Sequence, residues 1–188
     1  MIARALAVML VVIALLPPAR GWLEGSMARH MLLALPLLLG AGIVLGIPRT
    51  GADASPSPWN PAGIPGVVLA LGCSAVLMVP RVLDLAVRSP LIDAGKAVLG
   101  VVAGAALARS WRALGTLGQA FVIGNIGWML GAVGLLLRDA PERVCAVYLQ
   151  GDQRRAGTGL VVLAVVVVAG WLATAPWRND VPADAPIS

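Results

Sequence analysis

Residues that bind metals or carry out catalysis are scarce in this chain, which has one histidine and two cysteines in 188 residues. A single histidine excludes a bis-histidine haem site within one chain, and Cys73 and Cys145 form no CxxC or other metal-binding spacing. The sequence has no HExxH motif, no P-loop and no GxGxxG followed by a ribose-binding acid. No Ser/His/Asp arrangement is available with a base other than His30. We therefore expect a protein that is not an enzyme.

Charge is also scarce, because only 12% of the residues are charged while 59% are hydrophobic. A soluble domain of this length needs far more polar surface. The net charge of +5 comes from basic residues scattered singly without interleaved aromatics, so the composition does not favour nucleic-acid binding. Long apolar runs separated by short polar segments instead predict an all-α, polytopic transmembrane helical bundle of about six spans. We expect one integral membrane domain over residues 1–188.

Proline, glycine and arginine bound six apolar runs. The expected helices are Ala5–Leu16, Met27–Ile47, Ile64–Val87, Leu91–Ala108, Leu117–Leu137 and Gly157–Ala173. The first run is short and follows a basic start, so a signal peptide over residues 1–20 stays open as an alternative to a retained helix. The segment Pro48–Pro65 is rich in Pro, Ser, Gly, Asp and Asn and predicts a solvent loop.

Small residues recur in these runs at the spacing that lets membrane helices approach closely. Two GxxxG pairs occur, Gly42/Gly46 and Gly100/Gly104. The fifth run carries a glycine-rich face that we expect to lie against protein rather than lipid, formed by Gly124, Gly127, Gly131 and Gly134. Asn125 lies near the middle of that run and is expected to donate a hydrogen bond to a neighbouring helix.

His30 is the first candidate metal ligand, because it is the only histidine and stands at the entry to an apolar helix. Met27 precedes it by three residues, which places both side chains on one helix face. Imidazole plus thioether is a soft ligand pair that suits copper. The alternative is an interfacial or hydrogen-bonded histidine without a metal.

A second group of polar residues falls at the same membrane face as His30 in a six-span topology. This polar cluster is predicted to contain Arg81, Asp84, Asp152 and Gln153. A further pair, Asp93 and Lys96, has the i,i+3 spacing of a helical ion pair. No pair of carboxylates is expected inside a span, which argues against a proton relay or an ion-coupled transporter.

Basic residues are unevenly divided between the two faces of this topology. Five lie on the side of the termini and nine on the opposite side with His30. The positive-inside rule then places the His30 face in the cytoplasm. The difference between the two counts is modest, so orientation stays open.

Three segments together resemble the CtaG-type cytochrome c oxidase assembly factors. The helix from Glu24 to Gly40 is similar to that family's "HM-x-x-H-x-L…P-L-L-x-x-G" helix, in a histidine-poor version. The segment Val79–Ala86 resembles its "P-x-x-x-D/Y-x-A" segment, and Gly151–Gly157 resembles the "D-Q-x-x-G-G" turn that opens its last helix. The three segments occur in the family's order.

The resemblance implies a multi-pass protein of the bacterial cell inner membrane that helps mature a haem–copper terminal oxidase, with copper as the implied metal. Its partners would be the lipid bilayer and oxidase subunits, and the glycine-rich faces leave a homo-oligomer open. His30 carries over most directly from the family's metal site, followed by Asp152, Gln153 and Asp84. The alternatives are a structural membrane subunit without a metal site and a small-solute transporter.

Overall fold

The computed structural model describes residues 2–48, 58–142, 144 and 148–174, and every regular element in these ranges is helical. The expected all-α class is therefore confirmed. In chain order the elements are α1 (Ile2–Leu15), α2 (Pro17–Glu24), α3 (Met27–Arg29), the π-turn η1 (His30–Ala34), α4 (Leu35–Gly46), the 3₁₀ turn η3 (Pro61–Gly63), α5 (Ile64–Leu77), α6 (Pro80–Arg88), α7 (Pro90–Ser110), α8 (Gly115–Asp139) and α9 (Gln150–Thr174). Cys145 lies outside the described residues.

Four helical segments are by themselves long and apolar enough to cross a membrane: Met27–Gly46, α7, α8 and α9. The bent pairs α1/α2 and α5/α6 bring the number to six if each pair forms one span. These segments define a multi-pass membrane protein. They coincide with the apolar runs of the sequence, because backbone groups in lipid must be satisfied within the helix itself.

Two proline-initiated helices turn sharply away from the spans that precede them. The axes of α1 and α2 differ by 76°, and those of the segments on either side of Val79 differ by 72°. A residue before proline avoids the helical region, and Leu16 and Val79 are both extended, with ψ of 141° and 117°. The expected continuous helix Ile64–Val87 is thus two helices, because Pro80 starts a new one.

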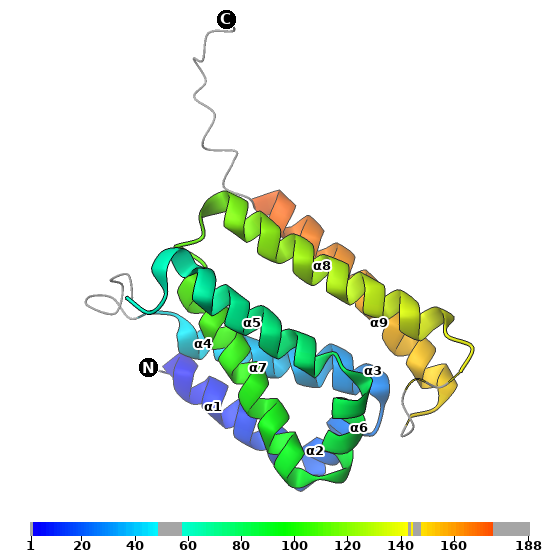
Figure 1. Ribbon diagram of the computed structural model, residues 1–188. Coiled ribbons are helices and arrows are strands. Elements are labelled where there is room, and N and C mark those ends of the chain that lie inside the picture. Colours follow the sequence, from blue (N-terminus) through cyan, green and yellow to red (C-terminus); the bar gives the residue numbers. More distant parts are fainter. Residues whose placement is uncertain (1, 49–57, 143, 145–147, 175–188) are drawn as a thin grey trace, which may run out of the picture.

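The part of the chain from α1 to α7 forms two consecutive units with the same plan. Each unit is a 14-residue helix, a short bent helix of 8 or 9 residues and a returning span of 20 or 21 residues. Each unit closes on itself, because Arg4 of α1 donates to Ile47 at the end of α4, and Asn60 before α5 bonds to Ser110 at the end of α7. The two units run parallel, since Gly42 and Gly46 of α4 lie against Val101 and Ala105 of α7 in the same order. Figure 1 shows α4 and α7 at the centre of this arrangement.

Glycines bring the two units together along α4 and α7. A Cβ at Gly46 would lie 2.6 Å from Ala105 Cα, and a Cβ at Gly104 would lie 2.8 Å from the Ile43 nitrogen. Both predicted GxxxG pairs therefore face each other across one interface, where only glycine permits this backbone separation.

The last two helices form a hairpin that touches the two-unit body at one end. α8 packs along α9, and α9 in turn packs on α3 and η1 (Figure 1). The glycine-rich face of α8 is split. Gly127 and Gly134 meet α9, whereas a Cβ at Gly124 or Gly131 would find nothing within 4 Å. The expectation that all four glycines lie against protein is therefore wrong within one chain, because spacings of 3 and 4 put them on two adjacent lines of the helix surface.

Candidate functional site

A buried network of charged side chains lies where the two units and the loop before α9 meet. Lys96 is its centre, since its ammonium lies 2.7 Å from Glu24 Oε1, 2.7 Å from Asp93 Oδ1 and 3.0 Å from His30 Nε2. A lysine has three N–H donors, so each is matched to one acceptor. Asp93 and Lys96 form the i,i+3 ion pair that the sequence predicts, while Glu24 and His30 come from the other unit.

His30 and Tyr148 extend the network to the segment before α9. The Tyr148 hydroxyl donates to the Glu24 carbonyl at 2.9 Å and lies 2.9 Å from His30 Nδ1. Because its only proton points at the carbonyl, the hydroxyl accepts from Nδ1–H. The other ring nitrogen then keeps its lone pair and accepts from Lys96. Both nitrogens of the fully buried imidazole are thus engaged.

Arg20 completes the charge balance. Its Nε lies 3.0 Å from Glu24 Oε2 and 2.8 Å from Asp93 Oδ2, and a terminal nitrogen donates to the Ala86 carbonyl of α6 at 2.9 Å. The network therefore contains two cations and two carboxylates. Such a balance is what makes burial of charge tolerable, because each ion keeps an opposite charge and hydrogen bonds in place of water.

A π-turn positions His30. Pro36 has no N–H with which to bond the preceding turn, and the helix widens so that the Leu35 N–H bonds to the His30 carbonyl, five residues back. Single π-turns inside α-helices are frequent at functional sites. Here the turn contains His30 and is followed by the glycine-packed part of α4.

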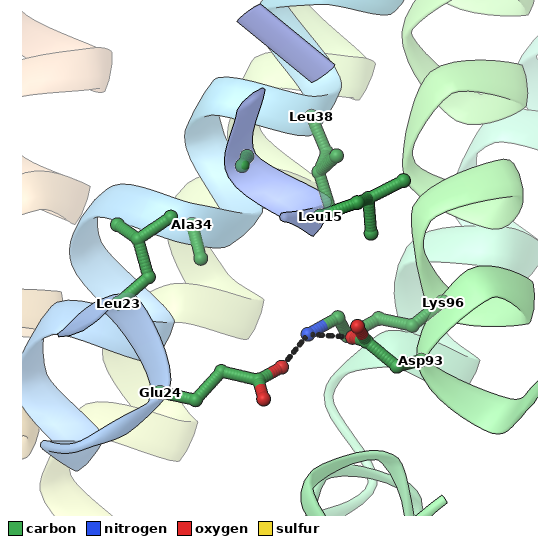
Figure 2. A pocket seen from close by; sticks show the side chains of 8 residues that line it. Leu15, Leu23, Glu24, Ala34, Leu38, Asp93 and Lys96 are labelled. Atoms are coloured by element: carbon green, nitrogen blue, oxygen red, sulfur yellow. Dashed lines mark hydrogen bonds and ion pairs between the residues drawn. The ribbon is translucent and has the colours of Figure 1, made fainter. Parts of the chain in front are cut away.

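A small cavity of about 20 Å³ borders the network, and it is wide enough for one water molecule. Figure 2 shows Glu24, Asp93 and Lys96 pointing toward one another at its edge, with Leu15 and Leu38 on the apolar side. The space is far below the ~300–1,000 Å³ of typical small-molecule sites. In this conformation the polar groups of the network bond to one another.

Asp152 and Gln153, two members of the predicted polar cluster, tie the hairpin to the rest of the protein. Asp152 accepts from the Ser26 hydroxyl at 2.8 Å and from the Met27 backbone N–H, so it caps the start of α3. Gln153 is buried and accepts from the Val144 N–H at 2.8 Å while donating to the Leu137 carbonyl at 3.1 Å. Asp152 therefore fixes the start of α3, and Gln153 fixes the last turn of α8 and the segment that follows it.

The other two members of the predicted cluster lie on α6. Arg81 is exposed, and Asp84 is half-buried. They share the end of the bundle with His30 (Figure 1), but the hydrogen bonds of the His30 ring go to Tyr148 and Lys96. The topology places these residues at the same end of the bundle as His30. The hydrogen-bond partners of the His30 ring, however, are not members of the predicted polar cluster.

The donor set around His30 does not fit a copper ion. Neither ring nitrogen offers a free lone pair, and the ammonium beside Nε2 would repel a metal cation. Met27 is 1% exposed and packs in the apolar core with Met31, Leu83 and Leu160. Among the residues that the structure describes, no group of three or more His, Cys, Asp or Glu side chains is arranged to hold a metal.

Sequence reasoning missed Arg20, Glu24 and Tyr148 as members of this site. Signals for two of them were present, since Arg20 and Glu24 have the i,i+4 spacing of an ion pair inside an otherwise apolar region. Tyr148 is the only tyrosine of the chain. Nothing in the local sequence indicates that it reaches residues 118 and 124 positions away.

No family model, curated protein or solved structure matches the chain.

Proposed function

We propose that this protein is a non-enzymatic accessory factor of the bacterial inner membrane that assists assembly of a haem–copper terminal oxidase. The observation that supports this proposal is the convergence of three separate segments on one end of the bundle. They are the segments that resemble the oxidase assembly factors. Three segments that together form one functional site are expected to resemble the same family, whereas segments that lie apart in the structure are not.

The contacts among these segments are direct. Asp152 of the third segment caps the helix that begins at Met27 in the first segment. Leu83 of the second segment packs in the same core as Met27. Arg20, just before the first segment, donates to the carbonyl of Ala86 in the second. The three segments thus contact one another directly around His30.

The role that we propose is a rigid docking end rather than a copper carrier. Every polar group of the His30 ring is used within the chain, and the charges around it balance. Such an arrangement favours a fixed shape for recognition of oxidase subunits over exchange of a ligand. The proposed partners are the bilayer, oxidase subunits and a second copy of this chain.

A strain that lacks the gene tests the proposal. It is complemented with the wild-type protein, with His30→Ala or with Arg155→Ala, an exposed arginine at the same end of the bundle. We expect deletion and His30→Ala to lower the amount of spectroscopically intact oxidase, whereas copper per assembled oxidase stays constant and Arg155→Ala behaves as wild type. An immunoblot of the membranes verifies equal protein levels. Normal oxidase in the deletion strain would contradict the assembly role, and a selective loss of copper would contradict the docking role.

The repeated units favour a second candidate function, membrane transport. Parallel repeats with a charged site between them occur in several transporter folds. The expectation was that no pair of carboxylates lies inside a span, whereas the buried Glu24 and Asp93 share the Lys96 ammonium, with Asp93 inside the span α7. Purified protein in sealed vesicles that dissipates a pH gradient, with loss of the effect in Glu24→Gln, would support transport. Tight vesicles would favour the accessory role.

A further inference from the structure

Asn125 is a polar residue in the middle of a membrane span, and no described residue of this chain bonds to its side chain. It is the eleventh residue of the 25-residue α8, and its side chain is only partly buried. Within the described part of the chain its amide takes part in no hydrogen bond. The hydrogen bond to a neighbouring helix that the sequence predicts for Asn125 is therefore not supplied by the described helices of this chain.

An amide at this depth needs a partner. The hydrocarbon core offers no hydrogen bonds, and transfer of an amide into it without compensation costs several kcal/mol. The asparagine side chain is too short to reach the headgroups from mid-helix. Lipid is thus a poor neighbour for this part of α8, although it suits the apolar residues of α9.

The surface around Asn125 is shaped for another helix. α9 is the long helix along which α8 packs, and side chains on the opposite side of α8 are exposed. Phe121 and Trp128 are 66% and 77% exposed there, and Gly124 lies between them with nothing within 4 Å of its would-be Cβ. A glycine between two large aromatic residues leaves a notch that a helix can approach closely.

We propose that α8 of a second copy of this chain occupies this face, with the two Asn125 side chains hydrogen-bonded to each other across a two-fold axis. An amide carries both donors and an acceptor, so two identical amides satisfy one another. A two-fold interface also places the same notch and the same aromatic residues on both sides. This inference is independent of the oxidase role, because it uses only α8.

Disulfide cross-linking of the full-length protein in native membranes tests the pairing. In a Cys73→Ala/Cys145→Ala background, single cysteines are placed on the proposed face by Trp128→Cys or Phe121→Cys. Val165→Cys is the matched control, because that position is 63% exposed and lies on α9 rather than on α8. We expect a cross-linked dimer from the two α8 positions and none from α9. Equal cross-linking at all three positions would overturn the proposal, as would a product with the mass of a different protein.

A second pair of variants separates pairing from folding. Asn125→Leu should weaken the dimer about tenfold in detergent, the effect of one interhelical hydrogen-bonded pair. Its thermal unfolding as a monomer should be unchanged, since the amide bonds to none of the described residues of its own chain. Asn125→Gln keeps an amide and should retain most of the dimer. A dimer of Asn125→Leu as tight as wild type would overturn the role of the amide.

Discussion

Lys96→Met removes the centre of the buried network while keeping a side chain of similar length. The ammonium donates to Glu24, Asp93 and His30, at 2.7, 2.7 and 3.0 Å. Without it, two buried carboxylates share the single cation Arg20, and the network changes from neutral to a net charge of about −1. The variant therefore tests whether balance of charge, rather than packing, holds this end of the bundle together.

The cost can be bounded from the contacts. Breaking a buried ion pair by removing one partner costs about 3–5 kcal/mol. The sum of three charge-assisted hydrogen bonds, at about 1.5–3 kcal/mol each, is larger, but such contributions within one network are not additive. Methionine also fills most of the lysine volume, so the cavity contribution is small. We expect Lys96→Met to lower the free energy of unfolding by about 3–5 kcal/mol.

The double variant Lys96→Met/Glu24→Gln supplies the decisive comparison. It keeps the Arg20–Asp93 pair at 2.8 Å and restores neutrality, so it should be more stable than Lys96→Met alone by at least ~1 kcal/mol. Unfolding in mixed detergent micelles, followed by tryptophan fluorescence, measures both. Arg155→Met, an exposed change at the same end, should stay within about 0.5 kcal/mol of wild type. A double variant less stable than the single one would refute the charge-balance argument.

Three further predictions concern single contacts, each measured by the same unfolding assay. Gly134→Leu should destabilise the hairpin by more than ~2 kcal/mol, because a Cβ there would lie 2.8 Å from a carbonyl oxygen of α9, whereas Gly131→Leu should leave the monomer nearly unchanged. Tyr148→Phe should cost about 1–3 kcal/mol, since it leaves the buried Nδ1–H of His30 without an acceptor; a neutral result would show that water replaces the hydroxyl. Asp152→Ala should cost about 1–2 kcal/mol through loss of a helix cap, and no change would mean that solvent satisfies the start of α3.

Hydrophobic periodicity predicted much of the fold because lipid leaves the backbone few options. Most spans begin and end close to the proline, glycine and arginine boundaries of the sequence, but α9 begins at Gln150 rather than at the predicted Gly157. The Asp93–Lys96 pair also follows from local spacing alone. The separate helix α2 and the division at Pro80 were missed, because a proline after an apolar run is compatible with either a kink or a new helix.

The sequence by itself determined an all-α membrane chain, most of its long helices and the location of His30 at the start of a span, since these depend on local composition and helical geometry. Only the tertiary structure decided what His30 does. Its partners are Lys96 and Tyr148, residues 66 and 118 positions away. It also decided which glycines of α8 meet α9 and which leave Asn125 beside an open notch. Contacts of this kind depend on how helices rotate and pack against one another, and hydrophobic patterning leaves that rotation undetermined when almost every face is apolar.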